Sequence, residues 1–282
     1  MKRINTVGAT RVISLLMGLL LSLSLVACKT AEPDGRITTE EPAIGQSVGG
    51  RAAYELWEVA NKSREEAESI SFELDYQMTL ANVEPSKGIE MSMSGPIQMA
   101  SQGSDDAQMA LDLRVVAMGQ NLSMQAWYKD GYYYYSLLGM KLKQAMSTQD
   151  ALSQNSFTFL SFSESAIKEQ SLSDTPDGGK RLSFLLDGTQ TTELVEDLLA
   201  SGAQSSGLDL GSLDIATHDI TVIAVVDQND RLSECTYGFD INMPADTGWT
   251  TAACHVAMTQ IRYDNLSIVF PNNLDSYTEA PL

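Results

Sequence analysis

The chain has 282 residues, of which 43% are hydrophobic, and it carries 18 Lys and Arg against 37 Asp and Glu, a formal net charge of −19. A negative field of this size disfavours nucleic acid and anionic lipid headgroups, both of which require neutralising cations. We therefore expect no nucleic-acid partner. The hydrophobic content is sufficient for the core of one large domain or two small ones.

The first 27 residues have the pattern of an export signal. Basic side chains among the first eleven residues precede an apolar run over 12–27, which is shorter than the roughly 20 residues that a membrane-spanning helix requires. The run ends in Leu25–Cys28, LVAC, which resembles the lipobox of bacterial lipoproteins. The alternative is an ordinary membrane helix that happens to end beside a cysteine.

The lipobox resemblance implies that residues 1–27 are a signal peptide and that Cys28 becomes the first residue, with a thioether-linked diacylglyceryl group. Two acyl chains are sufficient for stable attachment to a membrane, whereas one chain binds only marginally. We therefore expect a protein that is lipid-anchored to the extracytoplasmic face of the cell membrane. Removal of the signal leaves 15 basic and 37 acidic residues, a net charge of −22.

Residues 28–50 are rich in Glu, Pro, Gly, Thr and Ser and show no apolar periodicity, which is typical of a disordered tether. A single domain is expected over 51–282. It begins with an amphipathic helix over 51–68, because apolar residues recur there at helical spacing. These residues are Ala53, Leu56, Trp57 and Ala60.

Long alternations of apolar and polar residues follow the helix, and they indicate strands with one buried face. Three such strands lie over 70–80, 89–94 and 106–115. The connections between them are short and polar, which favours an antiparallel meander over βαβ units.

The stretch WYKDGYYYY over Trp127–Tyr135 predicts a tight hairpin. Asp130-Gly131 is a favoured two-residue loop, because a type I′ turn needs positive φ at both positions. With this loop, Tyr128 pairs with Tyr133. Opposed residues share a face, so the register decides which rings lie together.

The two faces of this hairpin differ in character. One face carries Tyr128 and Tyr133 and continues the apolar face of the meander. The other carries Trp127, Tyr132 and Tyr134. These three rings either stabilise the hairpin as cross-strand pairs or form a binding platform, and both interpretations are open.

Further elements are expected in the second half of the chain. Helical segments are expected over 148–154, 163–170 and 189–201, and strands over 139–146, 179–187, 217–227, 231–242, 251–264 and 266–270. The order of helix, meander, helices and meander indicates an α+β fold.

Two cysteines remain once Cys28 is assigned to lipid. An even pair, Cys235 and Cys254, favours a disulfide in an oxidising compartment. The strands expected over 231–242 and 251–264 form a hairpin. If the numbers of paired residues in this hairpin sum to 489, Cys235 lies opposite Cys254. We expect a cross-strand disulfide, worth about 3 kcal/mol; two buried free thiols are the alternative.

The lipobox, the early helix, the strands that alternate Met and Leu with Glu and Ser, and the tract YKDGYYY followed by LLGMKLKQAM resemble Gram-positive lipoproteins of unknown function in the LolA/LppX-like superfamily. The resemblance covers roughly 51–270. It implies a strongly curved antiparallel sheet, an open half-barrel wrapped around a few helices, whose concave face can hold acyl chains. Characterised members carry lipoproteins or lipids between membranes.

These features predict a non-enzymatic lipoprotein that binds an apolar ligand, a lipid or the acyl chain of another lipoprotein, in the concave face of its sheet. Methionines line surfaces that accept variable apolar partners, and they also fill irregular cores. The expected lining residues are Tyr76, Met91, Met93, Met109, Met124, Tyr128 and Tyr133. The alternative is an envelope protein-interaction or scaffolding module that uses Trp127, Tyr132 and Tyr134.

Catalytic and metal motifs match only formally. GQSVG over 45–49 lies in the expected tether, and Ser165–Lys168 matches S-x-x-K without its companion motifs. His218 and His255 have no partner at ligand spacing. The loop aspartates lack EF-hand spacing, so no metal, cofactor or catalytic residue is expected, with structural calcium as the alternative; they are Asp174, Asp177, Asp209, Asp214, Asp227 and Asp230.

Overall fold

The structure is a computed structural model that describes residues 52–102, 104, 106–117, 119–148, 150–151, 160–192, 195, 216–243 and 249–280. Its first elements are the helix α2 (Ala53–Glu65) and the strands β1 (Ile70–Asn82), β2 (Ile89–Ala100), β3 (Gln108–Ala117), β4 (Gln120–Lys129), β5 (Tyr132–Leu137) and β6 (Met140–Ala145). They are followed by β7 (Ile167–Asp174), β8 (Lys180–Leu186), β9 (Ala216–Thr217), β10 (Ile220–Val226), β11 (Leu232–Asn242), β12 (Trp249–Arg262) and β13 (Thr278–Glu279). Short 3-10 turns lie at Pro85–Lys87, Glu164–Ala166 and Leu274–Ser276.

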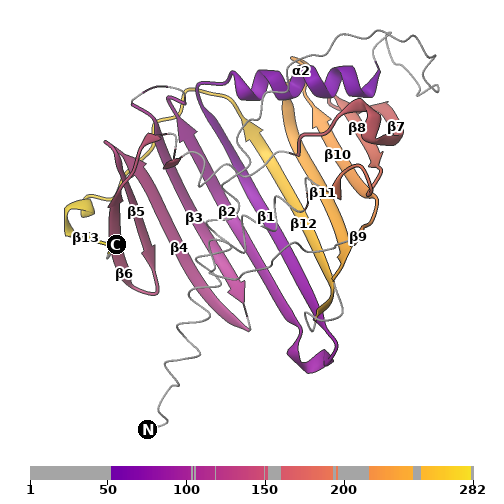
Figure 1. Cartoon of the computed structure of the whole chain (residues 1–282). Helices are drawn as coiled ribbons and strands as arrows, with labels where there is room; N and C mark the ends of the chain where they lie inside the picture. Colours follow the sequence, from indigo (N-terminus) through magenta and orange to yellow (C-terminus); the bar gives the residue numbers. More distant parts are fainter. Residues whose placement is uncertain are drawn as a thin grey trace.

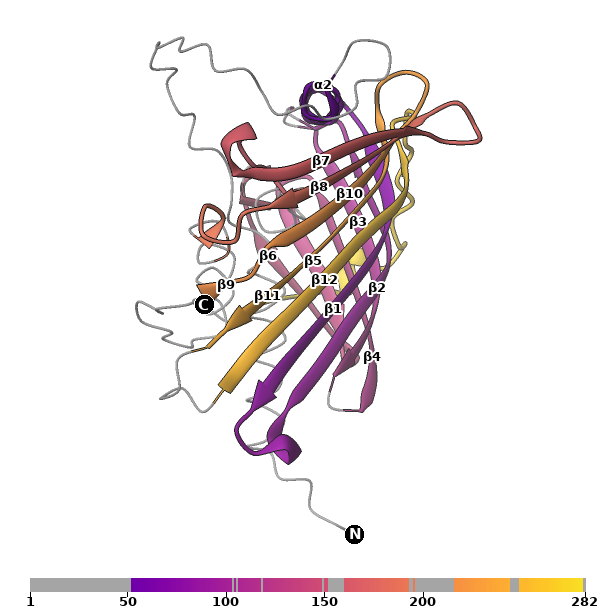
Figure 2. The same ribbon diagram turned by 90° about the vertical axis from the view of Figure 1, so that its right-hand side faces the viewer.

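All the strands among the described residues belong to one sheet, in which β1 is central (Figure 1). On one side of β1 the chain forms a meander from β2 to β6, and on the other side it runs through β12, β11, β10, β8 and β7. These pairs are antiparallel, whereas β13 adds to β6 in parallel. Because β7 and β13 end the sheet at opposite edges, the sheet stays open. Figure 2 shows it curving from β4 round to β7. The predicted curved, open antiparallel sheet of an α+β fold is confirmed.

Close approach of two strands accompanies this curvature at Gly95 in β2. Its φ is +145°, and a Cβ on this residue would lie 2.2 Å from the carbonyl oxygen of Asp112. Only glycine adopts this backbone without strain and leaves the space that the neighbouring β3 backbone occupies.

The helix α2 lies across one end of the sheet (Figure 1) and packs mainly against β7, β8 and β11. It buries the predicted stripe of Ala53, Leu56, Trp57 and Ala60. Trp57 stacks on Phe162, with 5.2 Å between the ring centroids, and both rings contact the edge of Phe184 from β8. No helix among the described residues is long and apolar enough to cross a membrane.

Several sequence expectations require correction. The helix expected over 163–170 is a 3-10 turn followed by β7, and the strand expected over 266–270 is irregular. β7 is an edge strand that buries only Leu172, so its sequence carries no clear period-2 alternation. The signal, Cys28, the tether, the GQSVG motif and most of the helix expected over 189–201 lie outside the described residues.

Candidate functional site

The predicted lining residues all lie on the concave face of the sheet, in two groups. Met109, Tyr128 and Tyr133 are about 20 Å along the strands from the group of Tyr76, Met91, Met93 and Met124, because Met93 pairs with Val115 and Met109 with Met99. In the observed register Tyr76 lies opposite Met93 across β1 and β2. Met109 lies opposite Tyr128 across β3 and β4, and Tyr128 lies opposite Tyr133 across β4 and β5. Opposed residues in an antiparallel pair point to the same face, so the seven side chains share one surface.

This surface is apolar and covered. Met93 and Met109 are fully buried, and Tyr76, Met91, Met124 and Tyr128 are each less than 9% exposed. Tyr133 is half-buried and packs against the same cluster. No charged side chain is among the buried residues of the described part of the chain. The face therefore offers dispersion contacts and burial from water, and few groups that would orient a polar ligand.

Besides α2 and Val195, described segments of the connection between β6 and β7 pack on the concave face. Leu160 and Ala151 are buried in the core cluster, and Phe162 and Met146 pack against it. Tyr128 Oη donates to the carbonyl oxygen of Met146 at 3.3 Å and lies 3.1 Å from Thr148 Oγ1. An apolar ligand would reach the lining residues by displacing such segments.

A second group of polar side-chain atoms, from Tyr76, Met78 and Cys254, lies on the concave face where β1 pairs with β12. Tyr76 Oη donates to Met78 Sδ at 3.5 Å and also interacts with the Cys254 thiol. Burial raises the pKa of Cys254 to about 12, and the hydrogen bond with Tyr76 acts in the opposite direction. Burial likewise raises the pKa of Tyr76 and Tyr237 well above the ordinary value. These groups stay neutral near pH 7, which keeps the surface uncharged.

The expected disulfide does not form. Cys235 lies opposite Met258, and Cys254 lies opposite Phe239, so the residue numbers in each pair sum to 493 rather than 489. The two cysteines share the predicted face, but four residues of register separate them by about 14 Å. A disulfide requires Cα atoms within about 7 Å. Both thiols are free, and burial raises the pKa of Cys235 to about 12 as well.

The hairpin register is confirmed at every pair from Lys129 and Tyr132 to Met124 and Leu137. Asp130 and Gly131 have φ values of 54° and 77°, as the predicted turn requires. Trp127, however, is not an exposed platform. It is 9% exposed, because Tyr277 from the C-terminal part of the chain packs edge-on against it at 6.3 Å.

Tyr132 and Tyr134, the other two rings of that face, are half-buried. Tyr134 also meets Tyr277 edge-on, with 5.7 Å between the centroids. Sequence reasoning missed Tyr277, because no periodicity or motif around it predicts a contact with Trp127 and Tyr134, which lie 150 and 143 positions earlier. It also did not name Tyr237 as a lining residue, although the alternation in 231–242 places it on that face.

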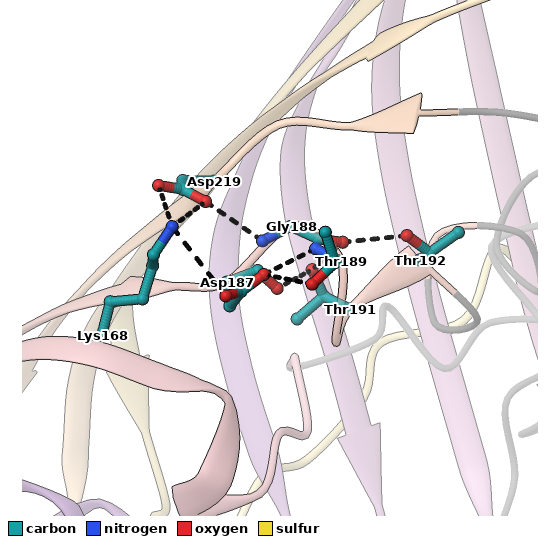
Figure 3. Close-up of polar contacts among 7 residues, drawn as sticks. All are labelled: Lys168, Asp187, Gly188, Thr189, Thr191, Thr192 and Asp219. Atoms are coloured by element: carbon teal, nitrogen blue, oxygen red, sulfur yellow. Dashed lines mark hydrogen bonds and ion pairs between the residues drawn. The ribbon is translucent and has the colours of Figure 1, made fainter.

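A polar cluster ties the β7 edge together (Figure 3). Lys168 Nζ lies 3.0 Å from both carboxylate oxygens of Asp219 and 3.9 Å from Asp187 Oδ2. Asp187 caps the turn after β8 by accepting from the backbone N–H of Thr189. Ser165, the other end of the S-x-x-K match, bonds the hydroxyl of Ser163 instead. Lys168 therefore pairs with carboxylates and anchors a turn.

Metal ligands do not assemble in the part of the chain that the structure describes, where no group of three or more His, Cys, Asp or Glu side chains could hold an ion. His218 Nε2 lies 3.0 Å from Asn242 Nδ2. Asp227 accepts from the backbone N–H groups of Asn229 and Arg231 in its own turn. Asp209 and Asp214 lie outside the described residues.

No family model matches the sequence, and no curated protein matches it. Similar solved structures include LprF from Mycobacterium bovis, with 12% identity and a TM-score of 0.38 over 78% of this chain and 96% of LprF. The Mycobacterium tuberculosis lipoprotein LppX has 9% identity and a TM-score of 0.37 over 77% of this chain and 97% of LppX. A DUF1329 family protein from Desulfovibrio piger ATCC 29098 has 11% identity and a TM-score of 0.25 over 76% and 95%. Similarity at this level identifies neither a family nor a ligand for the chain.

Proposed function

We propose that the protein is a non-enzymatic lipoprotein, anchored outside the cytoplasm through Cys28, that binds an acyl chain or another apolar ligand in the concave face of its sheet. The observation that carries the proposal is the uncharged surface formed by Tyr76, Met93, Met109 and Tyr128 across four adjacent strands. Each CH₂ group that such a surface removes from water contributes about 0.8 kcal/mol.

The methionines on this face suit a ligand of variable shape. Met78 lies opposite Met91, and Met99 lies opposite Met109, so flexible thioethers face each other across neighbouring strands. Unbranched side chains change rotamer at little cost and can close around an acyl chain or around each other. In the apo state they fill the face, which accounts for their low exposure.

Native mass spectrometry tests the proposal on a chain that begins at residue 28, carries Cys28→Ser and is purified without detergent. We expect bound masses of lipid size that leave on denaturation. Met93→Gln should reduce uptake of an added fatty acid, whereas Ser92→Gln, one residue away on the opposite face, should leave uptake unchanged. An apo mass with no uptake of added lipid would refute the proposal.

A second function, protein interaction or scaffolding at the envelope, is favoured by the aromatic rings of the convex face. Lys143 Nζ lies 5.2 Å from the ring centroid of Tyr132, and Tyr132 is 6.2 Å from Tyr134. Aromatic and cationic side chains are enriched in interfaces. Under this function Tyr134→Ala should abolish capture of an envelope partner in a variant that circular dichroism shows to be folded, and unchanged capture would exclude these rings.

A further inference from the structure

The C-terminal strap, defined as residues 271–280, covers the aromatic surface of β4, β5 and β6. Figure 1 shows the chain leaving β12 and crossing to the far edge of the sheet, where β13 adds to β6. In Figure 2 this segment lies on the side of the sheet opposite to its concave face. The surface is therefore separate from the proposed lipid site.

One side chain anchors the strap. Tyr277 is 5% exposed and inserts between Trp127 and Tyr134, meeting them at 90° and 84°. Lys141 Nζ lies 5.7 Å from the Tyr277 ring centroid on a third side. A buried aromatic ring held by other rings and a cation is the usual composition of a binding hot spot.

The residues after Tyr277 continue along β6 as a short added strand. Thr278 pairs with Leu142 and Glu279 with Lys143, and the backbone N–H of Ala280 donates to the carbonyl oxygen of Lys143 at 2.8 Å. Glu279 also lies 3.6 Å from Lys143 Nζ. This arrangement is β-augmentation of a sheet edge, a common mode of peptide recognition, performed here within one chain.

Little else holds the strap in place. Its residues Asn272, Asn273, Asp275, Ser276, Thr278 and Glu279 are exposed. The ion pair to Lys143 is at the surface, where such pairs contribute about 0–1 kcal/mol. Two side-chain hydrogen bonds add to these contacts: Thr278 Oγ1 donates to the carbonyl oxygen of Lys141 at 3.3 Å, and Tyr277 interacts with the Ser136 side chain. The attachment therefore depends on one aromatic anchor, a two-residue pairing and a few polar contacts, which an external peptide with the same features can replace.

The charge around the surface also selects a ligand. The chain has a net charge of −19, yet Lys129, Lys141 and Lys143 each lie here beside an aromatic ring. Lys129 is paired with Asp130 at 3.7 Å, so Lys141 and Lys143 supply the positive charge at the β6 edge. A local positive patch on an acidic protein favours acidic peptides over basic ones.

We propose that the β6 edge, with Trp127 and Tyr134, is a docking site for an extended peptide of another protein that presents an aromatic residue followed two positions later by an acidic residue. The strap, with Tyr277 and Glu279 in these positions, occupies the site until such a peptide displaces it. The inference rests on the interaction function proposed second above, and it gives that function a ligand chemistry and a regulatory element.

Fluorescence polarisation with a labelled peptide of residues 270–280 tests the proposal. The intact chain is compared with a chain that ends at residue 269. The tethered strap competes at an effective concentration on the order of 1 mM, so the peptide should bind the shortened chain roughly 10–100-fold more tightly if its own Kd is tens of micromolar. Tyr277→Ala in the intact chain should open the site without shortening the chain, and circular dichroism checks that both variants are folded.

Two matched changes test the recognition chemistry. A peptide with Tyr277→Ala should lose binding, and a peptide with Glu279→Lys should bind the Lys143→Glu protein better than the native protein.

A folded, opened variant that does not bind the peptide would overturn the proposal, as would equal binding of the peptide to the intact and the shortened chain. If peptide binding fails while Tyr134→Ala still abolishes partner capture, the ligand chemistry is wrong and the interaction function stands. A strap-exchanged dimer of the intact chain would assign the site to a second copy and exclude a different protein as its ligand.

Discussion

The ring of Tyr277 stands perpendicular to the indole of Trp127, with 6.3 Å between the ring centroids. The two residues are far apart in the sequence. The hairpin alone would expose Trp127, and the contact with Tyr277 buries it. The concave face and the strapped convex face thus use the same strands, since Tyr128 points to one and Trp127 to the other.

Tyr277→Ala should lower the free energy of unfolding by about 1–3 kcal/mol, because it removes a buried aromatic side chain and its edge-to-face contacts. We also expect faster proteolysis within 264–280. Thermal denaturation and limited proteolysis measure both effects. Asn272→Ala, an exposed position in the same strap, is the control. Unchanged melting and cleavage would show that the strap does not depend on this ring.

The sequence predicts the register of the β4–β5 hairpin correctly and that of the β11–β12 hairpin wrongly, for a physical reason. Asp130-Gly131 leaves a two-residue loop whose geometry dictates the pairing, so each partner from Tyr128 and Tyr133 onward is correct. Between β11 and β12 the paired residues Asn242 and Thr251 are joined by a longer connection. Such a loop does not specify a register, and the alternating pattern specifies only the face.

The burial of side chains was likewise predicted correctly only where it follows from local sequence. The side chains of α2 and β1 that face inward were predicted from local periodicity, which the structure confirms. The edge strand β7 has little alternation to detect, and the contact of Tyr277 depends on residues distant in the sequence. Local pattern therefore predicts which face of an element is buried, while strap contacts and exact registers require the assembled fold.

The register difference leads to a prediction for Cys235 and Cys254. Because Cys235 is buried, Cys254 is half-buried and desolvation raises each pKa to about 12, both should react very slowly with a thiol reagent at pH 8 in the native state. In a chain that begins at residue 29, both should react in guanidinium chloride without a reductant. A native mass lower by two hydrogens, or no reaction on unfolding, would show that a disulfide forms after all.

Two glycines with positive φ should respond differently to alanine. Gly95→Ala places a Cβ against the carbonyl oxygen of Asp112, whereas nothing lies within 4 Å of a Cβ at Gly139, where φ is +80°. Gly139→Ala should therefore cost only the backbone strain, about 1 kcal/mol. Gly95→Ala should cost clearly more, about 3 kcal/mol or above, since the β3 backbone must also move. Chemical denaturation measures both, and equal costs would mean that the close approach of β2 and β3 relaxes easily.

The cluster around Lys168 predicts a dependence of stability on pH. The hydrogen bond from Lys168, followed by that from the Gly188 backbone N–H, lowers the pKa of Asp219 below its ordinary value. A carboxylate with a lowered folded-state pKa stabilises the fold above its unfolded-state pKa of about 3.9, and this contribution is lost as the pH falls through the folded-state value. Asp219→Asn should therefore melt at a lower temperature than the native chain at pH 7.

The two melting temperatures should converge as the pH falls below the lowered folded-state pKa of Asp219, because the native carboxyl is then protonated as well. At alkaline pH, the hydrogen bond with Asp219 raises the pKa of Lys168 above its ordinary value. The stabilisation of the fold by charged Lys168 is therefore fully present below the unfolded-state pKa of Lys168. It is lost only as the pH rises through the folded-state pKa. Asp264→Asn, at an exposed position after β12, is the control and should follow the native curve throughout. A deficit of Asp219→Asn that stayed constant from pH 7 down to strongly acidic pH would show that the side chain holds the β8 turn through its shape and its contact with Gly188, independently of its charge.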